Sequence, residues 1–201
     1  MIALPPNAPF TPEQIGWLNG YLAARMQVQQ APGTSQALPA QSAPAPAGKA
    51  VHILWGSQTG TSEGLAKKTS KTLSAAGHQT TVTDMADSDA QKLVEAEYLL
   101  VITSTYGDGE PPDNAAELHE LLHADDAPSF ANTNFAVLGL GDSEYPDFNQ
   151  CAKEFDAVLE KLGGQRLCPR VDCDVDYDDP FDQWLAQVSE SLAKPAEAAA
   201  A

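Results

Sequence analysis

The sequence predicts an α/β protein built on a doubly wound, five-stranded parallel sheet with helices on both faces. Three observations predict this fold. Short apolar runs alternate with helix-like amphipathic segments five times between residues 51 and 193. The runs at 97–103 and 134–140 are almost continuously apolar, as expected of parallel strands that are buried on both faces. Three of the runs end in loops rich in glycine and hydroxyl residues, as expected where a strand of such a sheet is followed by a helix.

The expected elements follow one another in a regular order. Strands are predicted at 51–55, 79–84, 97–103, 134–140 and 165–171. Helices are predicted at 60–76, 87–96, 112–124, 148–162 and 179–192, the second of them with a weak pattern. Because every strand is followed by a helical crossover, neighbouring strands are expected to run parallel.

Composition divides the 201-residue chain into four parts. They are an N-terminal extension (1–28), a Pro/Ala-rich linker (29–50), the α/β domain (51–194) and a short tail (195–201). The linker has four prolines and seven alanines, and Lys49 is its only charged residue. Such a segment cannot bury enough apolar surface to fold by itself, so we expect it to be extended and mobile.

A single helix is predicted within the N-terminal extension, at residues 11–26. Thr11 can cap it, and Pro12 suits the first helical position. One apolar face is formed by Ile15, Leu18, Leu22 and Met26. An isolated helix of this length is marginally stable. We therefore expect it to pack on the domain or, as the favoured alternative, on another subunit.

The charge of the chain limits its partners. Asp and Glu total 28 against 11 Lys and Arg, a formal net charge of −17. This balance argues against nucleic acid and anionic membranes as partners, and it fits either simple solubility or docking of a basic protein. No apolar run approaches the roughly 20 residues of a membrane span, and the first ten residues do not resemble a signal peptide. With three cysteines in no metal-binding spacing, the sequence predicts a cytoplasmic protein with reduced thiols.

The first of the three loops combines hydroxyl groups with the start of a helix. Backbone N–H groups at a helix N-terminus bind phosphate. The loop lacks Lys and Arg, and the nearest cations are Lys67 and Lys68, so it favours one phosphate group over a polyphosphate. Neither Gly-Lys-Ser/Thr nor G-x-G-x-x-G is present, and an ordinary capped helix start is the alternative. The candidate residues are Ser57, Gln58, Thr59, Gly60, Thr61 and Ser62.

The other two loops each carry a tyrosine near glycines. Tyr106 follows the run at 97–103, and Tyr145 follows the run at 134–140. Glycines allow close approach of the backbone, and two aromatic rings can stack on a flat ligand. Because loops at the carboxyl ends of parallel strands meet at one edge, a phosphate site and two rings predict flavin mononucleotide (FMN).

Residues 51–193 resemble the flavodoxin-like FMN domain of the diflavin reductases. The resemblance is carried by the motifs SQTGTS, STYGDGEPPDN and GLGDSEYPDFNQCAKEFDAVLEKLGG. The segments LGGQRLCPRVDCDVDY and FTPEQIGWLNGYL are most similar to the flavoprotein alpha component of assimilatory sulfite reductase. One departure is Tyr106, where sulfite reductase flavoproteins often have glutamine.

The resemblance implies the strand order 2-1-3-4-5 and a set of FMN contacts. It places the phosphate on the first loop and the ring system on the other two. The residues it assigns to the ring and ribityl chain are Ser104, Thr105, Tyr106, Gly107, Leu140, Gly141, Asp142, Tyr145, Phe148 and Asn149. Asp174 is at the position of an acid near the flavin. No side chain is expected to act as a catalytic acid or to bind a metal.

The resemblance also implies electron transfer from an FAD/NADPH reductase module to a basic haem or iron–sulfur acceptor, such as the sulfite reductase haemoprotein. The chain would then be part of a longer diflavin reductase or a free-standing carrier for another reductase. A non-redox assembly module that uses residues 11–26 is the alternative of a different class. Acids that could form a docking face are Asp108, Glu110, Asp113, Asp142, Glu144, Asp147, Asp172, Asp174, Asp176, Asp178 and Asp179.

Two competing patterns carry less weight. Residues 119–123 match H-E-x-x-H, but the pattern is short, and Leu118, Leu121 and Leu122 are expected to form the buried face of that helix. A signalling receiver would have an acidic pair after the first strand, where this chain has Gly56 and Ser57.

Overall fold

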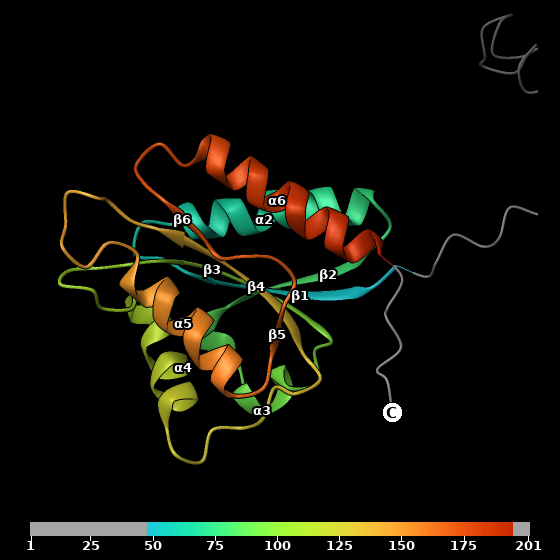
Figure 1. Cartoon of the computed structure of the whole chain (residues 1–201), viewed down its shortest axis with the longest axis horizontal. Coiled ribbons are helices and arrows are strands. Elements are labelled where there is room, and N and C mark those ends of the chain that lie inside the picture. The colour runs from blue at the N-terminus through green and yellow to red at the C-terminus, as the bar shows by residue number, and fades with distance from the viewer. Residues whose placement is uncertain (1–47, 195–201) are drawn as a thin grey trace, which may run out of the picture. The chain divides into compact units, whose positions relative to one another are not determined.

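The computed structural model describes residues 48–194 (Figure 1). The predicted helix at 11–26, most of the predicted linker and the tail at 195–201 lie outside the described residues and stay predictions. The first strand, β1, spans Ala50–Gly56 and therefore begins one residue before the predicted domain boundary.

The sheet is parallel throughout and has the order β2-β1-β3-β4-β5. Its other strands are β2 (Gln79–Asp84), β3 (Tyr98–Ser104), β4 (Asn134–Leu140), β5 (Gln165–Arg166) and β6 (Val171–Cys173). Both β5 and β6 pair with β4, so the fifth strand is in two pieces and the prediction of one strand at 165–171 was wrong. The break contains Pro169, which has no N–H for the ladder.

Helices cover both faces of this sheet (Figure 1). They are α2 (Thr61–Ala75), α3 (Ala90–Leu93), α4 (Asp113–His123), α5 (Gln150–Lys161) and α6 (Asp178–Ala193). Figure 1 shows α2 and α6 on one face and α3, α4 and α5 on the other. The doubly wound α/β fold is thereby confirmed.

The predicted helix at 87–96 is replaced by two short turns. A 3₁₀ turn, η1 (Met85–Asp87), precedes the single turn of α3. The carboxylate of Asp84 accepts the Ala86 N–H at 3.0 Å, and that of Asp89 accepts the Gln91 N–H at 3.0 Å. Each aspartate caps a new turn, and this explains why no continuous helix forms here.

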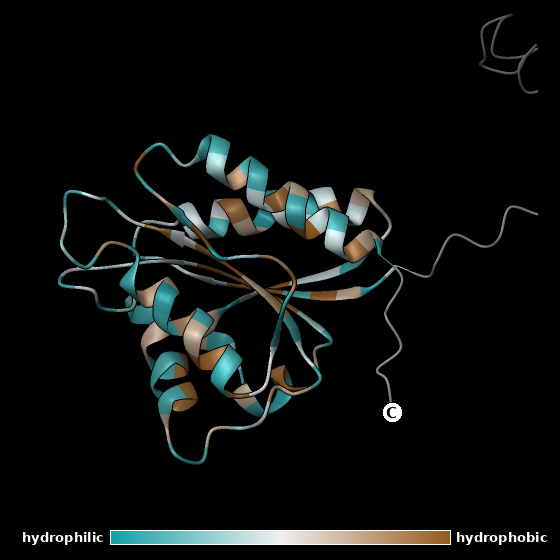
Figure 2. Ribbon diagram, in the orientation of Figure 1, coloured by the Kyte–Doolittle hydropathy of each residue, from teal (hydrophilic) through white to brown (hydrophobic). Residues whose placement is uncertain are grey.

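Two hydrophobic clusters lie on the two faces of the sheet, and Figure 2 shows apolar residues concentrated between the layers. One contains Phe181 and Trp184 of α6, and the other contains Phe135 of β4 and Phe155 of α5. β3 is buried along almost its whole length, as its apolar sequence predicts.

The buried face of α4 differs from the prediction at one position. Ala115, Leu118 and Leu122 are buried, whereas Leu121 is 46% exposed. Ala115 shifts the apolar stripe around the helix, and Leu121 lies to one side of it. Within residues 48–194, no helix is both long and apolar enough to cross a bilayer.

Candidate functional site

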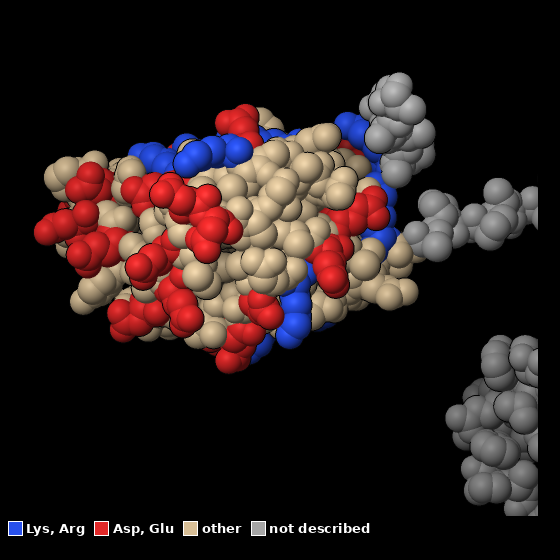
Figure 3. Space-filling model, turned by 90° about the horizontal axis from the view of Figure 1, so that it is seen from below, with Lys and Arg blue, Asp and Glu red and all other residues tan. Residues whose placement is uncertain are grey.

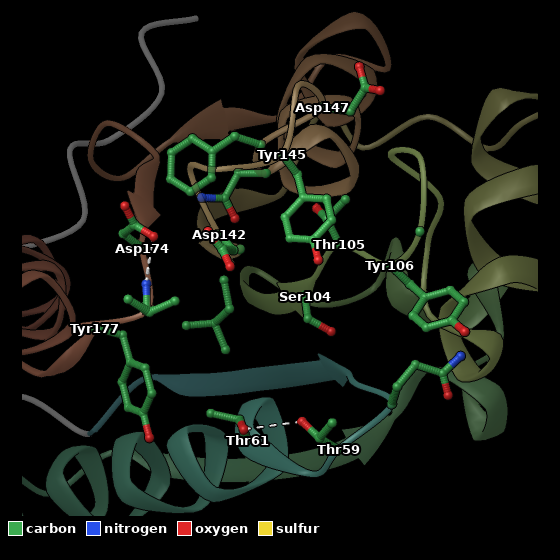
Figure 4. A pocket seen from close by; sticks show the side chains of 17 residues that line it. Thr59, Thr61, Ser104, Thr105, Tyr106, Asp142, Tyr145, Asp147, Asp174 and Tyr177 are labelled. Carbon is green, nitrogen blue, oxygen red and sulfur yellow. Dashed lines mark hydrogen bonds between the residues drawn. The ribbon is translucent and has the colours of Figure 1, made fainter.

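A cavity of about 590 Å³ opens at the carboxyl ends of the strands. It is lined by the loops that follow β1, β3, β4 and β6 (Figure 4). All the predicted site residues line it except Ser57, Gly60 and Ser62. Three further lining residues, which sequence analysis missed as site residues, are Asp147, Val175 and Tyr177.

The loop after β1 presents the start of α2 to the cavity. Gly60 has a φ of 86°, a left-handed conformation that glycine adopts without a steric penalty. No side chain caps the helix, so its first N–H groups have no partner from the cap residue. The hydroxyls of Thr59 and Thr61 lie 3.3 Å apart beside this helix start (Figure 4). The arrangement can donate several hydrogen bonds to one anionic group.

Of the three predicted residues that do not line the cavity, Ser57 and Gly60 lie in this loop and Ser62 is the second residue of α2. The Ser57 N–H donates to Asn114 Oδ1 at 2.9 Å, and the Ser57 hydroxyl accepts the Gly60 N–H at 3.0 Å. Ser62 is fully buried. The six residues are alike in the sequence pattern, but in the structure Gln58, Thr59 and Thr61 line the cavity, whereas hydrogen bonds of Ser57 and Gly60 hold the loop.

The loop after β3 is a tight hairpin that exposes a tyrosine ring. The N–H of Tyr106 donates to Glu110 O, and the N–H of Glu110 donates to Tyr106 O, both at 2.8 Å. Gly107 and Gly109 have φ values of 51° and 97°, which allow the turn. The Thr105 N–H donates to Leu140 O at 3.0 Å and thereby joins this loop to the end of β4.

The loop after β4 is held by hydrogen bonds within itself and to the end of β6 and the residue after it. The Tyr145 N–H donates to Asp142 O at 3.1 Å, and the Glu144 N–H donates to Asp142 Oδ1 at 2.9 Å. At its end, Asn149 is fully buried and donates from Nδ2 to Cys173 O at 3.0 Å. The ring of Tyr145 is left 61% exposed.

Asp174 joins the loop after β6 to the loop after β4. Its carboxylate accepts the Ser143 hydroxyl, the Ser143 N–H at 3.1 Å and the Val175 N–H at 2.8 Å. These hydrogen bonds, that of the Ser143 hydroxyl first, lower the pKa of Asp174 below its ordinary value. Asp174 lines the cavity, and its carboxylate links the loop after β4 to the loop after β6.

Exposed apolar surface is concentrated around the cavity. Of the large hydrophobic side chains exposed within residues 48–194, Tyr106, Tyr145 and Val175 line it, and only Leu121 lies elsewhere. In Figure 4, Tyr106 and Tyr177 lie at opposite sides of the view, with Tyr145 between them. Aromatic surface next to a few converging donors is typical of a small-molecule site.

Known proteins are similar to this chain in sequence and in fold. Residues 53–184 match the flavodoxin family model. The chain belongs to the flavodoxin family. A solved structure of a cysteine-to-alanine mutant of flavodoxin from Pseudomonas aeruginosa has a TM-score of 0.64 and 34% identity, over 72% of this chain and 99% of that one. The flavodoxin of Streptococcus pneumonia TIGR4 has a TM-score of 0.64 and 29% identity, over 72% and 97% of the respective chains.

Curated relatives are named "Sulfite reductase [NADPH] flavoprotein alpha-component". That of Bacillus subtilis is 48% identical over 94% of this chain and 33% of the relative. That of Neisseria meningitidis is 39% identical over 96% of this chain and 33% of the relative. The chain thus spans about a third of the length of the curated relatives it matches. The resemblance predicted from the sequence motifs is confirmed.

The cavity of this flavodoxin-family chain is acidic. Its lining residues include Asp142, Asp147 and Asp174 and no Lys or Arg. The lysines nearest in sequence to the first loop form ion pairs with other residues: Lys67 with Glu63 and Lys68 with Asp182. Figure 3 shows acidic side chains gathered at the end of the molecule where the cavity loops lie.

One acid of the predicted docking face is engaged within the domain. The Asp172 carboxylate accepts from Arg170 Nε at 2.7 Å, and Arg170 also contacts Asp156. Asp172 is thus in an ion pair with Arg170, whereas Asp176, Asp178 and Asp179 are exposed. Of the predicted docking acids in this segment, Asp172 is therefore paired with a cation; the docking role itself stays a prediction.

The histidines of the H-E-x-x-H pattern bind other groups of the domain. His119 Nε2 is 2.8 Å from Glu154 Oε2, and His123 Nδ1 donates to His119 O at 2.8 Å. Burial lowers the pKa of His119. In the described part of the chain, no three His, Cys, Asp or Glu side chains are grouped to hold a metal ion.

The three cysteines are also not in reactive surroundings. Cys151, Cys168 and Cys173 are buried and unpaired. Burial raises the pKa of Cys151 to about 12 and those of Cys168 and Cys173 to about 11. Thiols with such pKa values are poor nucleophiles at neutral pH.

Proposed function

We propose that this domain binds FMN in the cavity and serves as an electron carrier. The observation that carries the proposal is the cavity itself, in which an uncapped helix start and exposed tyrosine rings meet without a Lys or Arg in the lining. Its volume of about 590 Å³ is within the range of about 300–1,000 Å³ that is usual for cofactor sites.

The phosphate would bind at the start of α2. Thr59 and Thr61 provide hydroxyl donors there, and the helix dipole favours a negative charge. A single phosphate can be bound by neutral donors, whereas the acidic lining disfavours a second one. The lack of a cation therefore supports a monophosphate over a dinucleotide.

The ring system would bind between the loops after β3 and β4. Tyr106 and Tyr145 are 56% and 61% exposed, and a flat ligand would cover this apolar surface. Each aromatic contact adds about 0.5–1.5 kcal/mol beyond the burial of area. Ser104, Gly107 and Gly141 also line this part of the cavity and would present backbone polar groups to the ring.

Bound FMN would supply the redox chemistry, since flavins take up electrons in pairs and release them singly. The names of the relatives support an NADPH-dependent system. We propose that an FAD/NADPH reductase module is the donor and that a haem or iron–sulfur protein, such as the sulfite reductase haemoprotein, is the acceptor. The protein would place the ring at an acidic end of the molecule, where a basic acceptor is attracted.

Calorimetry with two flavins tests the cofactor. The 201-residue chain, freed of any bound flavin, is titrated with FMN and with riboflavin, which lacks the phosphate. We expect FMN to bind at least about 30-fold more tightly, because charge-assisted hydrogen bonds contribute roughly 1.5–3 kcal/mol each. A folded chain that is colourless as purified, before any flavin is removed, and gives no heat with FMN would overturn the proposal and favour the assembly module.

Charge neutralisation tests the acceptor. Asp176, Asp178 and Asp179 are changed together to Asn, and electron transfer from the reduced FMN-loaded chain to cytochrome c, a basic haem acceptor, is followed. We expect transfer at low salt to slow by roughly tenfold and its salt dependence to flatten.

The matched control neutralises three exposed acids at the other end of the sheet. Glu95 precedes β3, and Asp125 and Asp126 precede β4. This variant has the same net charge, and transfer should slow much less. Equal slowing in both variants would reject docking at the cavity end.

A further inference from the structure

Asn114 connects the loop after β1 to two other parts of the fold. It lies in the first turn of α4, and its side chain is half-buried. Its Oδ1 accepts the Ser57 N–H at 2.9 Å. Its Nδ2 donates to Asp84 Oδ1 at 2.9 Å and to Trp55 O at 3.4 Å. One amide thus bonds the end of β1, the loop after it and the end of β2.

The orientation of this amide follows from its partners. An ionised carboxylate and a backbone carbonyl only accept hydrogen bonds, so Nδ2 must face Asp84 and Trp55. Oδ1 is then directed to the Ser57 N–H. Asp84 is itself fixed, because its Oδ1 also accepts the Ala86 N–H at 3.0 Å.

The hydrogen bond to Ser57 sets the position of the whole loop. The Ser57 hydroxyl accepts the Gly60 N–H at 3.0 Å, and Gly60 is the residue that precedes α2. Asn114 therefore anchors one end of a turn whose other end starts the helix. Thr59 lies in this turn and Thr61 is the first residue of α2. Both line the cavity.

We propose that Asn114 is a positioning residue for the phosphate end of the cavity. It does not line the cavity itself, and it acts through Ser57 and Gly60 on the donors that do. A pre-positioned donor set avoids the cost of ordering the loop when the ligand binds. This inference rests on the proposed function, because it names the residue that prepares the proposed phosphate site.

The test compares FMN with riboflavin in the variant Asn114→Ala of the 201-residue chain. We expect FMN affinity to fall about tenfold and riboflavin affinity to change less than about twofold. A general loss of structure would weaken both. By NMR hydrogen exchange, the Ser57 amide should lose its protection while the amides of β3 keep theirs.

Asn134→Ala is the matched control, because Asn134 also donates to a backbone carbonyl, Glu97 O at 3.3 Å, but at the start of β4. It should leave both flavin affinities unchanged. If Asn114→Ala does not fold, Asp84→Ala removes the acceptor that orients the amide and should weaken FMN selectively by about threefold.

Two failures are distinguishable. A wild-type chain that does not bind FMN overturns the proposed function. A wild-type chain that prefers FMN strongly over riboflavin, with the preference unchanged in Asn114→Ala and Asp84→Ala, overturns the role of Asn114 alone.

Discussion

The loop before α2 and the two tyrosine loops use their hydrogen-bonding groups in opposite ways. At the start of α2 no side chain caps the helix, and the hydroxyls of Thr59 and Thr61 lie at the cavity. In the other loops the N–H groups of Tyr106 and Tyr145 are bonded within the loop, and the rings are exposed. The cavity therefore has two different ends: a donor end at Thr59 and Thr61, and an apolar end at Tyr106 and Tyr145.

Both ends have a cost in the ligand-free protein. N–H groups at the helix start that have no protein partner must be solvated. Exposed aromatic rings lose the free energy of burial, roughly 25 cal/mol per Å² of apolar surface. A ligand with an anionic end and a flat aromatic end would recover both costs. If the two ends act separately, substitutions at the donor end and at the apolar end should affect FMN and riboflavin differently.

The largest effect is expected at the donor end. Thr59→Val with Thr61→Val removes two hydroxyl donors while keeping the shape of the side chains. FMN affinity should fall at least about 30-fold, and riboflavin affinity should be unchanged within about twofold, as measured by calorimetry. Thr72→Val, at an exposed site on the same helix, is the control. Equal losses for both flavins would show that the two ends are not separate.

A smaller effect is expected at the apolar end. Tyr145→Ala removes the aromatic ring. Because the Tyr145 hydroxyl makes no hydrogen bond with the described residues, Tyr145→Phe, which keeps the ring, serves as the control. FMN and riboflavin should both bind about 5- to 10-fold more weakly to Tyr145→Ala. Quenching of flavin fluorescence should decrease in parallel. A loss confined to FMN would contradict the assignment of this end to the ring.

The smallest effect concerns the connection between the loops after β4 and β6. The Asp174 pKa is lowered by the Ser143 hydroxyl and N–H, so the ionised carboxylate stabilises the fold above the ordinary Asp range. That contribution to stability is lost as the pH falls from the pKa of Asp174 in the unfolded chain, about 4, to its lower pKa in the folded protein. Thermal unfolding at pH 7 and pH 3 should show a smaller acid-induced decrease in Tm for Asp174→Asn than for wild type.

Ser143→Ala provides the comparison for that measurement, because it removes the hydroxyl donor and keeps the carboxylate. Its acid-induced decrease in Tm should also be smaller than in wild type. An identical pH dependence in all three proteins would show that the hydrogen bonds of Asp174 do not stabilise the fold.

Local pattern determined most of the fold. β2 and β4 have the bounds that their sequences predict, because alternation and continuous apolar character are properties of a few adjacent residues. The three loops were predicted for the same reason, since glycine, hydroxyl residues and tyrosine stand together in sequence. Parallel topology then required those loops to meet at one edge.

Only the tertiary structure decided how the loop residues divide their roles. Asn114 is 57 residues from Ser57, and Ser143 is 31 residues from Asp174, so no local pattern links either pair. The pairing of both β5 and β6 with β4 likewise depends on strands that are distant in sequence. Periodicity specifies which face of a segment is apolar, whereas hydrogen bonds between distant segments depend on where the packed helices and strands finally place each side chain.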